Sequence, residues 1–407
     1  MSGPRIFISH SAQKIPAKIA LNRIVESLDS LGCEVFVDKN ILPGSIWRDE
    51  IYTSIGRCHG AVILFADKDA LNSAWVYAET AALALRRWLS RDFRLIPVLG
   101  TGLKPDVLRE RRLEPFDLSR LQVVTYERPE DATLRINRQF ESLLTKVSDT
   151  PLDLLTAYVE RLIPHDPFLL ERALHEACAG SDLSNLDDLP SAVARSFFHI
   201  GLDAFRAVIE RLAGGMEKSG VERVTEIVLP FSISPEAVVP LARAALAPQQ
   251  QRIPLLKAHN DLTSKIYIRR AASHYPLRWM VIPVTGAGGE RTAEAIVSEI
   301  RHGFRSTDPY LESYDDAYID TRIAAAARSQ PVIVIVPGSV RGATIAEVQK
   351  RYPYCTFFIV APHGTAGTGQ QYVGLNVVEL PAALDAAKED HLFDQFLALR
   401  RLTLNMT

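Results

Sequence analysis

The sequence predicts an α/β protein in which two regions of alternating strands and helices flank a purely helical segment. Three observations carry this prediction: the alternation in residues 1–148, the lack of any strand pattern in residues 149–218, and the renewed alternation in residues 222–407. Strands separated by helices pair in parallel within a sheet that has helices on both faces. A chain of 407 residues also exceeds one ordinary hydrophobic core, so we expect three domains with these bounds.

The first region begins with a β-branched and aromatic run at residues 5–9, followed by helical spacing over residues 17–31. Gly32 predicts the end of that helix, because glycine readily adopts the left-handed conformation found just past many helices. The remaining elements expected here are a strand at 34–37, a Pro-Gly turn at 43–44, a helix at 47–55, a strand at 60–65, a helix at 73–88 and a strand at 94–99.

The helical segment and the last region follow. Amphipathic spacing predicts helices at 152–162, 168–177, 189–198 and 202–212, and Gly214-Gly215 suggests a linker after them. In the last region we expect strands at 224–230, 278–284, 332–336, 356–360 and 377–380. The expected helices of this region lie at 235–246, 292–304, 319–328, 344–351 and 390–402.

Composition narrows the class of protein. Hydrophobic residues make up 47% and charged residues 23%, which is typical of globular proteins and argues against disorder. The 46 basic and 48 acidic side chains leave a charge of −2, so no nucleic-acid partner is predicted. The sequence has neither an apolar run of about 18 residues nor a secretory signal, so we expect a cytoplasmic protein without membrane contacts. Four cysteines without a CxxC pair predict neither a disulfide scaffold nor a metal site: Cys33, Cys58, Cys178 and Cys355.

Four motifs in the first region occur in a fixed order. They are RIFISHS at 5–11, VFVD with ILPG at 35–38 and 41–44, the apolar strand AVILF at 61–65, and NSAWVYAE at 72–79. Over about residues 4–145 this order resembles the TIR domain family, in which a helix begins with the pattern S-x-W-x-x-x-E. The resemblance implies a flavodoxin-like parallel sheet whose ligand crevice lies beyond the carboxyl ends of the strands.

The resemblance also implies a reaction. TIR domains with a glutamate at this position of the motif can hydrolyse NAD+ at the bond between nicotinamide and ribose, which makes Glu79 the candidate catalytic residue. Cleaving that bond builds positive charge on the ribose, and a carboxylate beside the sugar stabilises this charge. Trp75 precedes Glu79 by four residues and therefore shares its helical face. NAD+ is the substrate in this interpretation, and no cofactor is expected. The alternative is that Glu79 has a structural role, as a residue that caps a helix or forms an ion pair.

Further candidates for substrate contacts follow the first two strands or share the face of Glu79. Alternatives stay open for several of them, since Phe7 can belong to the core, Ser9 or Ser11 can cap the next helix, and Asp38 can cap the following turn. The candidate substrate-binding residues are Phe7, Ser9, His10, Ser11, Asp38 and Trp75.

Assembly is a further implication of the resemblance. In the family, the loop that ends in Pro-Gly packs against a neighbouring TIR domain and completes the active site. We therefore expect homo-oligomers built through TIR–TIR contacts, with activity conditional on assembly. Many relatives carry charged residues where this loop is apolar, and the assembly residues expected here are Ile41, Leu42, Pro43, Gly44 and Trp47.

A second candidate site is the glycine-rich turn before the helix expected at residue 292. The layout is that of a P-loop, but arginine replaces the lysine and no magnesium-binding carboxylate follows the strand at 332–336. Residues 250–400 thus resemble an inactivated STAND nucleoside triphosphatase with a P-loop-like fold. The alternative fold is a Rossmannoid domain with a ligand pocket. The alternative role of the glycines is a tight turn that binds no ligand. Either fold implies a sensor or assembly platform that responds to a small nucleotide or a protein. The candidate ligand residues are Gly286, Gly288, Gly289, Arg291 and Thr292.

These inferences lead to one functional prediction and two alternatives. We expect an NAD+ glycohydrolase that releases nicotinamide and a linear or cyclic ADP-ribose after self-assembly, acting as an antiphage immune effector. The first alternative is a non-catalytic TIR scaffold or adaptor. The second is a nucleotide sensor that works through the glycine-rich turn.

Overall fold

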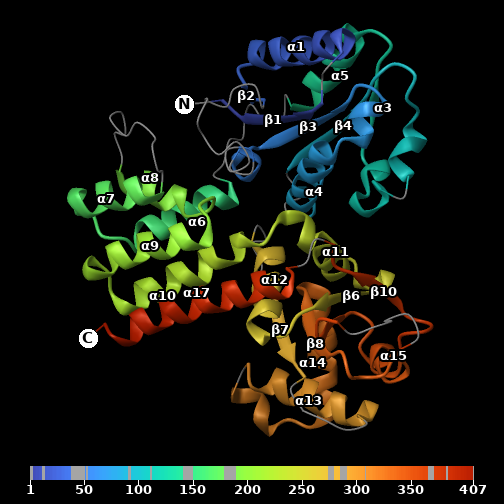
Figure 1. The fold of residues 1–407 in the computed structure, drawn as a ribbon. Helices are drawn as coiled ribbons and strands as arrows, with labels where there is room; N and C mark the ends of the chain where they lie inside the picture. The colour runs from blue at the N-terminus through green and yellow to red at the C-terminus, as the bar shows by residue number, and fades with distance from the viewer. Residues whose placement is uncertain are drawn as a thin grey trace. The chain divides into compact units, whose positions relative to one another are not determined.

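The computed structural model of the chain divides into two compact units. The first comprises residues 1–236 and 394–407, and the second comprises residues 237–393 (Figure 1). The domain boundaries expected near residues 148 and 218 stay predictions. The structure describes residues 3–11, 14–37, 51, 54–89, 93–110, 112–140, 150–177, 189–273, 279–284, 291–307, 309–364, 371–381 and 384–406.

A five-stranded parallel sheet lies at the start of the first unit. Its order is β2-β1-β3-β4-β5, and β1 pairs with β3 so that Ile8 lies opposite Val62. This strand order is that of the flavodoxin-like sheet, so the predicted α/β class is confirmed. The strands are β1 (Arg5–His10), β2 (Glu34–Phe36), β3 (Gly60–Phe65), β4 (Arg94–Leu99) and β5 (Val124–Thr125).

Helices cover both faces of this sheet (Figure 1). On one face, α1 and α5 share a core with alternate residues of β1, namely Ile6 and Ile8. On the other face, α4 contacts β1, β3 and β4. Because side chains alternate along a strand, Phe7 and Ser9 belong to the face that α4 covers. The helices are α1 (Ile15–Ser30), α3 (Lys68–Asn72), α4 (Ala74–Leu89), α5 (Pro129–Phe140) and the 3₁₀ turns η2 (Pro105–Arg109), η3 (Glu114–Phe116) and η4 (Leu118–Arg120).

Gly32 ends the first helix as predicted. It follows the last residues of α1 with a φ of +81°, a value that side chains disfavour, and its N–H donates to the carbonyl of Asp29. The chain then enters β2 directly.

The helical part of the first unit is an all-α bundle with its own core. The four helices expected in this segment are all present, and the last helix of the chain adds Leu399 to the same core. The helices are α6 (Pro151–Glu160), α7 (Pro167–Ala177), α8 (Leu189–Ser196), α9 (Leu202–Leu212), α10 (Lys218–Val228) and, from residue 394 on, α17 (Ala386–Leu404).

The strand expected at residues 224–230 is wrong, because residues 224–228 belong to α10 and residues 229–230 to the 3₁₀ turn η7 (Leu229–Ser232). Its buried residues Val221, Val224 and Val228 recur at helical spacing, while the charged residues between them stay exposed. The β-branched residues suggested a strand, but the burial of one helical stripe outweighs that local preference. The linker expected at Gly214-Gly215 is likewise a short 3₁₀ turn, η6 (Ala213–Gly215), that leads into this helix.

The second unit contains another five-stranded parallel sheet, in the order β10-β6-β9-β8-β7. Helices α13, α14 and α15 cover one face, where they share a core with alternate residues of the strands. The strands are β6 (Arg252–Lys257), β7 (Met280–Pro283), β8 (Val332–Pro337), β9 (Thr356–Ala361) and β10 (Asn376–Glu379). The helices, apart from α17, are α11 (Pro235–Leu246), α12 (Asp261–Ala272), α13 (Ala293–Arg305), α14 (Asp316–Ser329) and α15 (Gly342–Arg351), with the 3₁₀ turns η7 (Leu229–Ser232), η8 (Pro248–Gln250) and η9 (Pro309–Ser313).

Strand β6 is a strand that the sequence did not predict. It contains Pro254, which lacks an N–H and normally argues against an interior strand. The structure accommodates it because pairing with β9 begins only at Leu255, one residue further on. The connections after β6 and β9 lead to opposite edges of the sheet, so the topological switch point lies between these two strands.

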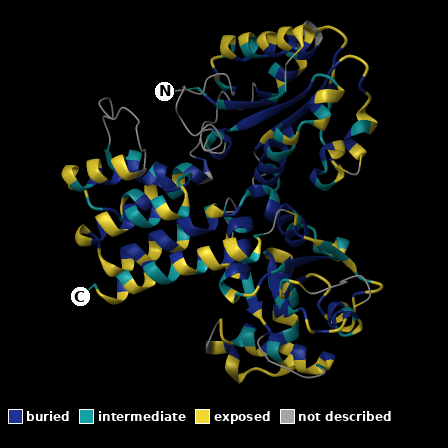
Figure 2. Ribbon diagram, viewed as in Figure 1, coloured by how far each residue is buried: buried dark blue, intermediate teal, exposed yellow. Residues whose placement is uncertain are grey.

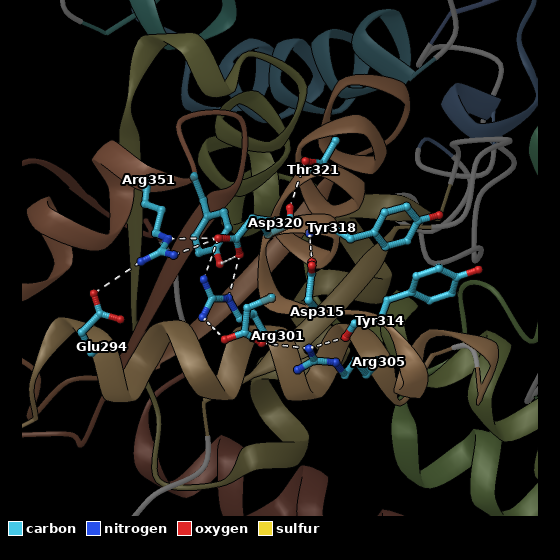
Figure 3. Close-up of polar contacts among 12 residues, drawn as sticks. Glu294, Arg301, Arg305, Tyr314, Asp315, Tyr318, Asp320, Thr321 and Arg351 are labelled. Carbon is cyan, nitrogen blue, oxygen red and sulfur yellow. Dashed lines mark hydrogen bonds and ion pairs between the residues drawn. The ribbon is translucent and has the colours of Figure 1, made fainter.

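Ion pairs fasten α13, α14 and α15 to one another (Figure 3). The guanidinium of Arg301 donates to both carboxyl oxygens of Asp320 at 2.8 and 2.7 Å, and Arg351 donates to Asp320 at 2.9 Å. Partial burial alone would raise the pKa of Asp320, but hydrogen bonds from Arg301, Tyr352 and Arg351 outweigh it and hold the pKa well below its usual range. This network stabilises the ionised carboxylate.

Burial follows the two sheets and the bundle (Figure 2). The central strand β3 is buried at all six positions, as its apolar sequence predicts for a parallel strand covered on both faces. Among the described residues no single helix is long and apolar enough to cross a membrane, although the bent pair of segments Lys218–Ser232 and Pro235–Leu246 meets that test jointly.

Candidate active site

Glu79 lies in a buried position near the carboxyl end of the first sheet. It belongs to α4, its exposed fraction is 2%, and its carboxylate accepts a hydrogen bond of 2.5 Å from the hydroxyl of Ser9 in β1. Ser9 itself is fully buried. A carboxylate that is withdrawn from water costs free energy unless polar groups surround it, so such a residue is a candidate for function.

Local capping explains how α4 brings Glu79 to this place. The carboxylate of Asp67 accepts from the N–H of Ala70 and starts the short helix α3, which ends at the residue before Ser73. The hydroxyl of Ser73 then accepts from the N–H of Val76 at 3.3 Å and caps the start of α4. The serine of the S-x-W-x-x-x-E pattern therefore fixes the helix start, and the glutamate follows one and a half turns later.

Arg112 supports the same helix start from a distant part of the chain. Its guanidinium donates to the carbonyl oxygens of Asn72 at 2.8 Å and of Ser73 at 3.3 Å, and it lies 5.0 Å from the centre of the Tyr77 ring. The sequence predicts no role for Arg112. No local pattern reveals a contact across forty residues, so this positioning role was missed.

The far end of α4 is anchored by a buried arginine. Arg86 has an exposed fraction of 3% and donates to the carbonyl oxygens of Gly56 and Cys58. Burial raises the pKa of the Cys58 thiol to about 11, so this cysteine is an inert core residue rather than a nucleophile. Contacts at both ends thus set the position of the Glu79 backbone.

The substrate-contact residues predicted after β1 differ in their surroundings. Phe7 has an exposed fraction of 1% and stacks on Phe36 with ring centres 5.6 Å apart, which matches the core alternative. His10 and Ser11 are half-buried at the end of β1, and Trp75 is half-buried in the first turn of α4. Ser9 and Glu79 are in contact; the substrate roles of all these residues stay predictions.

Other predicted residues lie outside the part of the chain that the structure describes. They are Asp38, the assembly residues Ile41, Leu42, Pro43, Gly44 and Trp47, and the glycines Gly286, Gly288 and Gly289. Two residues of the second candidate site are described. Thr292 caps α13 by accepting from the N–H of Ala295, as the expected helix start requires, and Arg291 forms an ion pair of 3.2 Å with Glu299.

The position of that second site in the sheet weakens a phosphate-binding role. The glycine-rich turn follows β7, which lies at the edge of the second sheet, whereas ligands of such sheets usually bind at the switch point. Arg291 would also have to leave Glu299 to reach a phosphate. The resemblance to STAND nucleoside triphosphatases stays a prediction.

The first strand is tied to the helical bundle through Asp153. Its carboxylate accepts from the N–H of Thr150, and the Thr150 hydroxyl oxygen accepts from the N–H of Asp153, which makes a capping box at the start of α6. The same carboxylate accepts from Arg5 of β1 at 2.6 Å and lies 3.5 Å from Arg57. Burial, with the neighbouring charge of Arg195, lowers the pKa of Arg57 to about 10, and the Asp153 carboxylate opposes this effect.

A cavity of about 630 Å³ lies at the carboxyl ends of β4 and β5. Its lining includes the cations Lys104, Arg135 and Arg138. None of the lining residues belongs to β1 or α4, so this cavity is separate from the Glu79 carboxylate. Within the described residues no group of three or more His, Cys, Asp or Glu side chains is placed to hold a metal ion.

Comparison with known proteins agrees with the geometry of the first sheet. A search of curated proteins finds no match to this chain. Residues 6–133, however, match the sequence model of the TIR domain. These residues contain the five strands, the capped start of α4 and the buried Glu79. The N-terminal segment of this chain therefore belongs to the TIR domain family.

Proposed function

We propose that the TIR domain is an NAD+ glycohydrolase that breaks the bond between nicotinamide and ribose, with Glu79 as its catalytic residue. One observation supports this above the others: the Glu79 carboxylate is buried to 2% exposure and bonded to Ser9 at 2.5 Å, beside the carboxyl end of β1. Ligand crevices of doubly wound sheets lie at this end. The proposal assigns no cofactor, since NAD+ is the substrate.

The chemistry asked of this carboxylate is electrostatic. Departure of nicotinamide leaves a ribose with oxocarbenium character, and a nearby negative charge stabilises that cation most strongly where water is excluded. Nicotinamide leaves as a neutral molecule, so no general acid is required. The Ser9 hydroxyl holds one carboxyl oxygen, which orients the other toward the crevice side of α4 in this proposal.

Self-assembly and biological role extend the proposal. We propose that TIR domains associate through the loop at residues 41–47 and that association switches catalysis on. Loss of NAD+ would then halt metabolism in an infected cell, which is the action of an antiphage effector. The product is ADP-ribose in linear or cyclic form, and the second unit acts as the sensor or assembly platform.

Nicotinamide release by the purified full chain tests the assignment. We expect NAD+ consumption at high protein concentration, and a loss of at least about a hundredfold in Glu79→Gln, because a preorganised charge in the transition state contributes that much. Glu34→Gln, which alters an exposed carboxylate in β2, is the matched control and should keep full activity. Equal release by the wild type and Glu79→Gln would remove the assignment.

A specific feature also supports a second function, that of a non-catalytic scaffold. The Glu79 carboxylate is almost fully covered and held by a core serine, as a structural residue would be. In a scaffold, the chain would bind other TIR domains without consuming NAD+. Self-association measured by light scattering, with no nicotinamide released at any concentration, would favour this function over hydrolysis.

A further inference from the structure

The cavity at the carboxyl ends of β4 and β5 has no part in the proposed cleavage of NAD+. Its volume of about 630 Å³ lies within the range of about 300–1,000 Å³ that small-molecule sites occupy. The switch point of this sheet lies between β1 and β3, so the cavity is also separate from the crevice proposed for NAD+.

A tight turn after β4 forms one wall of the cavity. The N–H of Leu103 donates to the carbonyl of Gly100 at 3.1 Å, and Gly102 within this turn has a φ of +82°, a value that side chains disfavour. A Cβ at Gly100 would overlap the carbonyl oxygen of Ala66, so glycine is required where β4 ends. The turn leads directly to Lys104, which lines the cavity.

Helix α5 forms another wall. Arg135 and Arg138 are three residues apart, so they lie on one face of the helix, and both are exposed. Ile136 and Phe140 of the same helix are buried in the core that α5 shares with the sheet. The two arginines are therefore carried by a packed helix and stay accessible to a ligand.

The charges that line the cavity are mainly positive. Three cations, Lys104, Arg135 and Arg138, face one carboxylate, that of Glu127. Within the part of the chain that the structure describes, no carboxylate forms an ion pair with any of the three cations. The excess of two positive charges matches a phosphate monoester, whose charge approaches −2 above its second pKa of about 6.

Apolar groups complete the lining. Leu103 and Tyr126 are buried, and Pro105 begins the 3₁₀ turn η2 beside Lys104. A phosphate group alone would leave this apolar wall and most of the volume uncovered. The organic part of a phosphate monoester would cover both, while arginine binds the phosphate through paired N–H donors and lysine adds a point charge.

We propose that this cavity binds a small organic phosphate monoester, whose phosphate group contacts the three cations and whose organic part covers the apolar wall. The site lies entirely within the TIR domain and uses no residue of the proposed reaction. The proposal is therefore independent of NAD+ cleavage.

Calorimetric titration of the full chain with phenyl phosphate tests the site. This probe is a phosphate monoester with an aromatic ring, and it lacks the sugars and bases of NAD+. We expect saturable binding of phenyl phosphate, severalfold weaker binding of inorganic phosphate, and no measurable binding of phenol. Absence of saturable binding by phenyl phosphate would overturn the proposal, and equal affinity for inorganic phosphate would overturn its assignment to an organic ligand.

Charge removal locates the bound phosphate. Arg135→Gln combined with Arg138→Gln should weaken the binding of phenyl phosphate at least about tenfold, because hydrogen bonds to a charged group contribute that much. Lys18→Gln combined with Arg23→Gln removes the same charge from exposed positions of α1 outside the cavity and should leave the affinity unchanged. Equal affinities in the two double variants would contradict binding in the cavity.

A filled cavity gives an independent test. Thr125 of β5 is exposed and lines the cavity, and Thr125→Trp adds volume there while every charge stays in place. A large aromatic residue also suits a strand. We expect this variant to lose the binding of phenyl phosphate. Unchanged affinity in Thr125→Trp would mean that the probe binds surface arginines rather than the cavity, and the proposal would fail.

Discussion

The hydroxyl of Ser9 donates to the carboxylate of Glu79 across the gap between β1 and α4, at 2.5 Å and out of contact with water. This bond joins the first motif of the TIR segment to the fourth. It explains why a serine at the end of the first strand and a glutamate in a helix seventy residues later belong to one site. The hydroxyl fixes one carboxyl oxygen, which is the preorganisation that electrostatic catalysis requires.

Ser9→Ala should therefore reduce catalysis without abolishing it. The carboxylate keeps its charge but loses a hydrogen bond to a charged group, which contributes about 1.5 kcal/mol, so kcat/KM for NAD+ should fall roughly tenfold. Initial rates of nicotinamide release measure this. A fall as large as that of Glu79→Gln would mean that Ser9 contacts the substrate itself rather than positioning the carboxylate.

Arg112→Ala should lower activity through the start of α4. Loss of two hydrogen bonds to the carbonyls of Asn72 and Ser73 frees the first turn, which carries Trp75. We expect KM for NAD+ to rise severalfold while the thermal midpoint changes little. Arg109→Ala, an exposed arginine in the same segment with only a 3.9 Å pair to Asp106, is the control and should match the wild type. Equal effects of both substitutions would show a general charge effect.

These residues show what the sequence could predict and what it could not. Most strands and α4 follow from local patterns, because apolar runs and capping residues act over a few positions. The choice of Glu79 follows instead from the resemblance of its motif to the TIR family. Helix α10 was not predicted, because its β-branched residues also fit a strand. Strand β6 was not predicted either, and its Pro254 argues against an interior strand. Arg112 donates to the carbonyl oxygen of Asn72, forty positions earlier in the chain. The carboxylate of Glu389 accepts from the N–H of His259, more than one hundred positions earlier. Only the folded chain brings such groups together.

Stability should depend on pH through His199. Burial, with the neighbouring charge of Arg57, lowers the pKa of His199 to about 4 from its ordinary value of 6.5. The unfolded chain then binds a proton between pH 6.5 and 4 that the folded chain does not. Stability is fully present above pH 6.5 and falls as the pH drops through this window. Urea unfolding of the full chain at several pH values should show this slope, and His199→Gln should flatten it. An unchanged slope in His199→Gln would assign the proton uptake to other groups.

Asp320→Asn should destabilise the second unit because Asp320 collects three partners. Arg301 is only 10% exposed and forms ion pairs with Asp316 and Asp320 of α14, so the substitution removes one of these two carboxylates. Tyr352 also loses a charged acceptor. Removal of one member of a largely buried pair costs 3–5 kcal/mol, and since Asp320 is partly exposed we expect about 2 kcal/mol. Glu294→Gln changes the exposed end of the same network and should cost less than about 0.5 kcal/mol. Chemical denaturation of both variants at neutral pH measures the difference.

The same contact predicts an acid dependence of stability. Because the pKa of Asp320 lies well below its usual range, the wild type should keep this stabilisation until the pH falls below the ordinary pKa of aspartate. Asp320→Asn should remove that acid dependence. Equal losses in the two variants would mean that the network acts through its surface charge rather than through the buried contact between Arg301 and Asp320.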